Sequence, residues 1–152
     1  MRFVFALIIS LLAPAAYAQS SPAWTTGQSA NASFASAPSP KGANSLGASL
    51  RFEAGQSTAQ LFITGLWSAR PLTLRLSVTY ASGKTTPLDT YRHGKIVMLQ
   101  GQPAYSLTLP RTALRPLKGG DTLVIEDTTM RGVIPLTGSS AAIKAAETRA
   151  GL

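Results

Sequence analysis

The sequence contains no cysteine, a single histidine and only six carboxylates. The absence of cysteine excludes disulfides, thiol catalysis and cysteine-ligated metal sites. Glu126 and Asp127 are the only adjacent carboxylates, and neighbouring residues on a strand point to opposite faces, so they are not expected to chelate one ion. The sequence therefore predicts no catalytic residues, no metal site and no cofactor.

The single histidine, His93, lies in the segment DTYRHG (89–94), which we interpret as a loop. A hydrolase would need a nucleophile and a carboxylate beside this imidazole. No Gly-x-Ser-x-Gly elbow is present, and Ser82 and Ser106 are only nominal nucleophiles. A solvated turn histidine is the favoured interpretation, and a hydrolase is the third of three functional hypotheses.

The N-terminus has the three-part layout of a secretory signal peptide. Arg2 precedes an apolar run of ten residues (3–12), and the small residues Ala16 and Ala18 immediately precede the expected cleavage site. A bilayer span needs roughly 20 apolar residues, so cleavage after Ala18 is favoured over anchoring. We therefore expect residues 1–18 to be removed, no transmembrane segment thereafter, and a periplasmic or secreted protein.

The mature chain is expected to be strongly basic. Without Arg2 it has thirteen Lys and Arg against six Asp and Glu, a formal charge of +7. Such a surplus favours anionic partners such as phospholipid headgroups, envelope polymers or an acidic protein surface. An exported chain seldom meets nucleic acid, so none is expected as a partner. Solubility through net charge is the alternative explanation.

Composition divides the mature chain into two parts. Residues 19–45 are rich in Ser, Ala, Pro, Gly and Asn and are expected to be largely flexible, with Trp24 as a candidate to pack back on the domain. Residues 46–152 are expected to form one β-rich domain, because short apolar-polar alternations are separated there by Gly and Pro. The candidate strands are 50–53, 59–64, 72–80, 95–99, 104–109, 122–127 and 132–137.

These patterns predict a mostly β fold, an antiparallel sandwich or partly open barrel of about seven strands. The segment 110–117 is broken by proline and is expected to form a single helical turn. An alanine-rich stretch, 141–150, follows the potential caps Ser139 and Ser140 and precedes Gly151. It predicts a short C-terminal α-helix that docks on the sheet.

Two groups of basic residues are the candidate binding surface. Arg92 and Lys95 form one group, and Arg111, Arg115 and Lys118 form the other. The second group could present three positive side chains on one turn-rich edge. An ordinary solvated charged face is the alternative interpretation of both.

Three C-terminal segments resemble the invasion-associated locus B family of small exported bacterial proteins. They are YSLTLP (105–110), ALRPLKGGDTL (113–123) and IPLTGSSAAI (134–143). The resemblance lies in the order of a lysine-glycine turn, a strand, a leucine-glycine step and an alanine-rich terminal helix. It implies a periplasmic or surface-associated β-sandwich with a role in envelope or host interaction, and it transfers no catalytic residues.

The leading hypothesis is a non-enzymatic exported envelope protein, a binding or structural module that contacts an anionic envelope component or a protein partner. The alternative is a periplasmic inhibitor or immunity-type protein that blocks an enzyme. Such an inhibitor would need a protruding loop or edge, for which the segments around His93 and Arg111 are the candidates.

Overall fold

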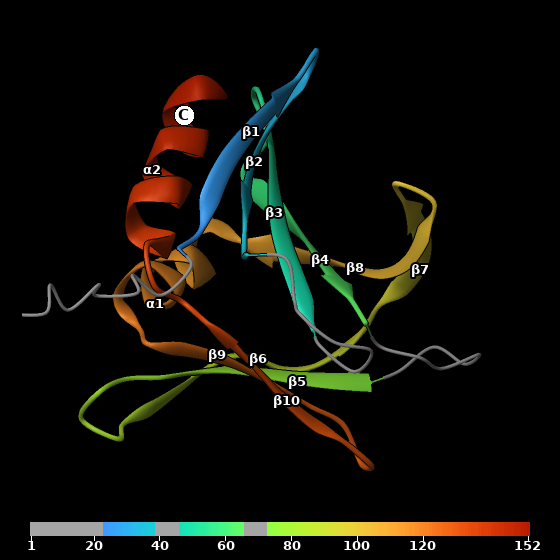
Figure 1. Ribbon diagram of the computed structural model, residues 1–152, viewed down its shortest axis with the longest axis vertical. Helices are drawn as coiled ribbons and strands as arrows, with labels where there is room; N and C mark the ends of the chain where they lie inside the picture. The colour runs from blue at the N-terminus through green and yellow to red at the C-terminus, as the bar shows by residue number, and fades with distance from the viewer. Residues whose placement is uncertain (1–22, 39–45, 66–72) are drawn as a thin grey trace, which may run out of the picture.

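A computed structural model of the protein describes residues 23–38, 46–65 and 73–152, with the side chains of residues 89–93 left out. The expected signal peptide, residues 1–18, lies outside this part of the chain. The described residues form two open antiparallel sheets and two short α-helices (Figure 1). The predicted mostly β, antiparallel fold with a C-terminal helix is thus confirmed.

The larger sheet has six strands in the order β1-β2-β3-β4-β8-β7. Their bounds are β1 Thr25–Ser29, β2 Ala32–Ser36, β3 Gly47–Glu53, β4 Thr58–Thr64, β8 Gln102–Pro110 and β7 Lys95–Leu99. The smaller sheet has four strands in the order β10-β9-β5-β6. Their bounds are β10 Arg131–Pro135, β9 Thr122–Glu126, β5 Thr73–Thr79 and β6 Thr85–His93.

Alternation of apolar and polar residues explains the central strands. In β3, Leu50 and Phe52 are buried while Arg51 and Glu53 remain partly exposed. In β4 and β5 the buried side chains also recur at every second position, because successive residues of a strand point to opposite faces. The two sets meet in one core, whose largest fully buried side chains include Leu61, Ile63, Leu74, Leu76 and Ile125.

The described residues contain ten strands rather than about seven, because three strands were not predicted. Two of them, β1 and β2, form a hairpin inside the segment 19–45, which was expected to be flexible. This expectation is wrong for residues 25–36: β2 pairs with β3, and its buried side chains are small, such as Ala35 and Ser33. Burial of small residues leaves no strong apolar alternation in the sequence.

The third unpredicted strand, β6, includes the segment interpreted as a loop around His93. His93 is instead the last residue of β6 and is paired with Thr73; its side chain is not described. The strand lies at an edge of its sheet, where Pro87 is tolerated because one side of the strand needs no backbone donor.

A 3-10 turn, η1 Arg111–Ala113, runs directly into α1 Leu114–Gly119. The segment is therefore longer than the single helical turn predicted. Pro116 is accommodated because it lies in the first turn of α1, where the backbone N–H groups have no partner within the helix. Leu114 and Leu117 are its buried residues.

The C-terminal helix, α2 Ser139–Arg149, begins two residues earlier than predicted. Its N-cap is Gly138, at a φ of 77°, and no side chain caps its first turn. The Ser139 hydroxyl instead donates to the Leu117 carbonyl oxygen at 2.7 Å. This buried hydrogen bond joins the two helices.

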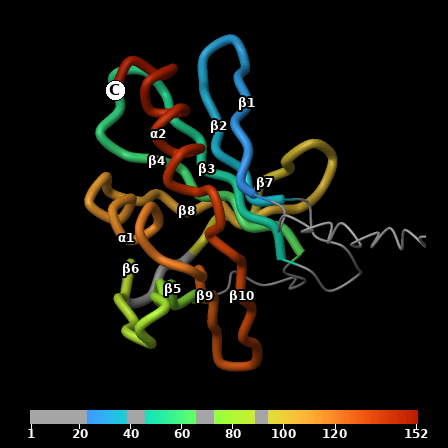
Figure 2. The backbone as a smooth tube through the Cα atoms, turned by 60° about the vertical axis from the view of Figure 1, so that its left-hand side comes forward, coloured from blue at the N-terminus to red at the C-terminus, as the bar shows by residue number. Residues whose placement is uncertain are grey.

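Two parts of the fold cover the core face of the six-stranded sheet, but they do not cover all of it. The helix α2 packs on β1, β2 and β3, and the four-stranded sheet packs farther along (Figures 1 and 2). The strand β7 lies on the side of the molecule opposite to α2 (Figure 2). Ile96 and Met98 of β7 remain 45% and 69% exposed, so the cover does not extend to this end.

Trp24 packs back on the domain, as predicted. It is 5% exposed, its indole Nε1 donates to the Pro135 carbonyl oxygen at 2.8 Å, and its backbone N–H donates to Thr137 at 2.9 Å. Together with the β1-β2 hairpin, these contacts make residues 23–38 part of the same folded unit as residues 46–65 and 73–152.

Candidate functional site

The predicted group Arg111, Arg115 and Lys118 lies on the segment formed by η1 and α1. Spacings of four and three residues put the three side chains on one face of a helical segment. Arg111 Nη2 donates to the Gln56 carbonyl oxygen at 2.8 Å, and Lys118 Nζ lies 3.1 Å from Glu147 Oε2. Arg115 is exposed and has no hydrogen bond or ion pair within the described part of the chain. Two of the three cations are thus held by intramolecular partners.

The other predicted group is divided between the two sheets. Lys95 is the exposed first residue of β7 and pairs with Ser106 in the six-stranded sheet. Arg92 pairs with Leu74 in the four-stranded sheet, and its side chain is not described. The chain passes from one sheet to the other between these two positions.

The structure brings two further cations, Lys144 and Arg149, to the helices. The ammonium group of Lys144 is exposed and has no partner among the described residues, and Arg149 Nη1 donates to Thr26 Oγ1 at 2.9 Å. Sequence reasoning missed them because it grouped charges by their distance along the chain. Their location in the predicted terminal helix was the available signal.

We name residues 111–119 and 139–149 the helical layer. It comprises η1, α1 and α2, which lie together on one side of the molecule (Figures 1 and 2). It contains five cations, namely Arg111, Arg115, Lys118, Lys144 and Arg149, against the single carboxylate of Glu147, a formal charge of +4. Most of the positive surplus of the described chain is thus concentrated on two helices.

The bridge between Lys118 and Glu147 also makes the helical layer a fixed unit. The two side chains are 27% and 17% exposed, so their charges are partly shielded from water and attract each other more strongly than a surface pair. The hydrogen bond from Ser139 to Leu117 adds a second link between α1 and α2. The exposed cations are therefore presented from a scaffold that holds their relative positions.

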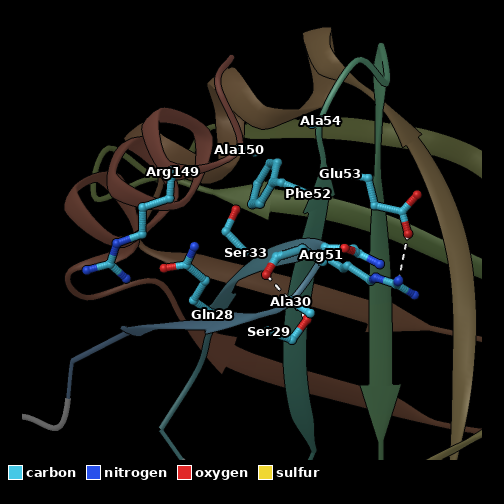
Figure 3. Close-up of a pocket in the computed structure, with 12 residues that line it drawn as sticks. Gln28, Ser29, Ala30, Ser33, Arg51, Phe52, Glu53, Ala54, Arg149 and Ala150 are labelled. Carbon is cyan, nitrogen blue, oxygen red and sulfur yellow. Dashed lines mark hydrogen bonds and ion pairs between the residues drawn. The ribbon is translucent and has the colours of Figure 1, made fainter.

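A cleft of about 550 Å³ lies between the β1-β2 turn, the end of β3 and the end of α2 (Figure 3). Arg51 Nη2 pairs with Glu53 Oε1 at 2.7 Å, while Arg51 Nε is buried without a partner. The guanidinium of Arg149 points away from that of Arg51 (Figure 3). Phe52 is only 1% exposed and offers no face for stacking. Polar side chains therefore line the cleft, but they do not converge on one point where a ligand could be bound.

The adjacent carboxylates Glu126 and Asp127 are engaged in local contacts. Glu126 Oε1 lies 2.9 Å from Arg131 Nε. Asp127 Oδ1 accepts hydrogen bonds from the Thr129 N–H at 2.6 Å, the Thr129 hydroxyl at 3.0 Å and the Met130 N–H at 2.7 Å. Partial desolvation raises the pKa of Asp127, but these hydrogen bonds to the charged form outweigh it and hold the pKa below its ordinary value. Asp127 thus stabilises the β9-β10 turn.

Neither a metal-binding cluster nor a membrane-spanning helix occurs among the described residues. No group of three or more His, Cys, Asp or Glu residues in this part of the chain is placed to hold a metal ion. No helix there is both long enough and apolar enough to cross a membrane.

Comparison with protein-family models, with curated proteins and with solved structures finds no match. Function therefore has to be inferred from the charge and geometry of the described residues. The helical layer combines the largest local excess of positive charge with fixed positions of its two helices.

Proposed function

We propose that this protein is a non-enzymatic, exported envelope module that binds an anionic envelope component through its helical layer. The observation that carries the proposal is the formal charge of +4 on residues 111–119 and 139–149. Charges gathered on one side of a small protein add their potentials, which attracts a polyanionic surface and orients the protein on it.

The carboxylates elsewhere in the molecule support this choice of surface. Glu53 pairs with Arg51 on β3, and Glu126 pairs with Arg131 across the β9-β10 hairpin. These pairs reduce the positive potential of the strands. Within the helical layer, by contrast, one carboxylate neutralises one of five cations, and the exposed Arg115 and Lys144 have no carboxylate partner in the described part of the chain.

The N-terminal segment supports an envelope location. Its charged start, its apolar run and the small residues that follow are typical of a secretory signal. In an exported protein, the anionic surfaces available to the helical layer are lipid headgroups and envelope polymers. We take anionic phospholipid as the probe, because its surface charge can be varied without changing anything else.

Binding to the probe is measured by co-sedimentation with vesicles that contain phosphatidylglycerol, against vesicles of phosphatidylcholine alone. The test variant is the double charge reversal Arg115→Glu/Lys144→Glu, since both side chains are exposed and neither has a side-chain partner among the residues that the structure describes. Each basic residue near an anionic surface contributes about 1 kcal/mol. Loss of two such contributions predicts binding at least about thirtyfold weaker.

The matched control is Lys84→Glu/Arg131→Glu, which changes the net charge equally at two exposed positions outside both the helical layer and β7. It should weaken binding by much less, and higher salt should weaken binding of the unaltered protein. Equal losses in both variants would assign the effect to net charge alone. Binding that neither double reversal weakens would exclude the helical layer as the binding surface.

A further inference from the structure

The strand β7 is a free edge of the six-stranded sheet. Among the strands that the structure describes, it pairs with β8 on one side and with nothing on the other. The backbone groups on that open side can form hydrogen bonds with another strand, so an edge of this kind is a template for association unless something blocks it.

The other three edges of the two sheets are blocked. The strand β10 has Pro135, which cannot donate to a ladder, and the charged Arg131. The strand β6 contains Pro87, and its pairing with β5 is interrupted by two register shifts. The strand β1 is polar, contains Gly27, and packs against α2 (Figure 1).

The strand β7 has neither proline nor a register shift, and its only charged residue, Lys95, is the first of the strand. Its sequence is KIVML, without glycine or acidic residues, and its pairing with β8 is regular. Ile96 and Met98 are 45% and 69% exposed. Ile96 lies opposite the buried Tyr105 of β8, so it points to the core-facing side of the sheet, and Met98, two residues on, points to the same side. Both side chains lie beyond the part of this face that α2 and the four-stranded sheet cover. An apolar face and an open backbone edge thus coincide on one strand.

We propose that β7 is a dimerisation strand, and that its partner is β7 of a second copy, paired antiparallel about Val97. This register places Ile96 opposite Met98 of the second copy, so two exposed apolar side chains from each copy form one continuous strip. Lys95 lies opposite Leu99 of the second copy. The sequence is therefore complementary to itself.

The charges of the two copies do not oppose this register. The two Lys95 residues stand four positions apart along the paired strands, about 14 Å at roughly 3.4 Å per residue. This exceeds the Debye length of about 8 Å at physiological ionic strength, so their repulsion is largely screened. An acidic strand from another protein would find only Lys95 to pair with on β7, whereas a second copy supplies a matching apolar face.

The dimer is independent of the proposed function. The strand β7 and the helix α2 lie on opposite sides of the molecule (Figures 1 and 2), so pairing through β7 leaves the helical layer of each copy exposed. Dimerisation is therefore measured without lipid, and its failure would leave the proposed binding to anionic surfaces untouched.

Disulfide trapping tests the register, because the chain has no native cysteine. On the two-fold axis, the two copies of a Val97→Cys residue face each other at a Cα separation of about 4.5–5.5 Å, within the range of a disulfide. The control is Val133→Cys, on the blocked edge β10, where the side chain is 53% exposed. We expect V97C to form a covalent dimer at least about tenfold faster than V133C, because pairing aligns the thiols. Equal rates would overturn the proposal.

Sedimentation of the purified protein tests the dimer without a crosslink. The mass should rise toward twice that of the monomer with increasing concentration. Met98→Lys should abolish this rise, because it places a charge in the apolar strip, and its 69% exposure in the monomer leaves the fold intact. Val133→Lys, the same change on β10, should dimerise normally. If the protein is monomeric at every concentration, a second copy is not the partner of β7. The same conclusion holds if β7 of such a monomer pairs with an added extended peptide.

Discussion

Replacement of Trp24 by alanine tests whether the N-terminal segment belongs to the folded domain. Trp24 is 5% exposed and belongs to the core cluster. Burial of a tryptophan removes about 150–250 Å² from water, and substitution of such a residue by alanine typically costs about 3–5 kcal/mol. The Pro135 carbonyl that loses its donor lies on an exposed residue and can bind water instead. We therefore expect W24A to lower the free energy of unfolding by about 3–5 kcal/mol.

Urea denaturation followed by far-ultraviolet circular dichroism measures this change. Trp24→Phe is the matched variant: it keeps most of the buried ring and removes the hydrogen bond to Pro135, so about 1–2 kcal/mol should be lost. The loss of unfolding free energy should be larger for W24A than for Trp24→Phe. A loss below about 1 kcal/mol for W24A would be typical of a surface position. It would refute the conclusion that residues 23–38 are part of the domain.

Two further predictions concern turns. An alanine Cβ at Gly120 would lie 2.0 Å from Val78 Cγ1, so Gly120→Ala should destabilise by about 1–3 kcal/mol in the same urea assay. Gly119→Ala, whose nearest contact is at 3.9 Å, should be neutral or stabilising, and equal losses would refute the packing argument. Asp127→Ala should lower stability by about 1 kcal/mol at pH 7. Because the folded pKa of Asp127 is depressed, its contribution is present above the ordinary value of 3.8 and is lost as pH falls through the folded pKa. The difference in unfolding free energy between this variant and the unaltered protein should therefore shrink below about pH 4. A difference that stays constant down to acid denaturation would contradict this role. Asp121→Ala is the control.

Most of the strands that sequence reasoning predicted bury large side chains at every second position, whereas β7 and β10 were predicted from their alternation although much of it is exposed. In β3, for example, Leu50 and Phe52 supply that signal, and both are nearly inaccessible to solvent. The strands it missed depend on their neighbours. Ser33 is buried because α2 covers it, and its hydroxyl donates to the Ala146 carbonyl oxygen, a contact between residues far apart in the chain. No local pattern announces a contact of that kind.

The candidate binding surface was also predicted only in part, because some of its features depend on contacts between distant segments. The sequence suggested that Arg111, Arg115 and Lys118 lie on one turn-rich edge, and the structure places them on the segment formed by η1 and α1. The sequence did not reveal that Lys118 is paired with Glu147 or that Lys144 joins the same layer. Those facts depend on how α1 and α2 pack against each other. Because Lys118 is paired, Arg115 and Lys144 are the better residues to substitute in a test of binding.

The sequence by itself determined the class of fold, the terminal helix and the excess of positive charge, because alternation, helix propensity and composition are local or additive properties. It also excluded every use of cysteine. Only the tertiary structure decided which cations are neutralised, which strand is left as an open apolar edge, and that residues 23–38 pack with the rest of the described chain. Each of these depends on contacts between distant segments, whose geometry is set when the two sheets and α2 close over one core.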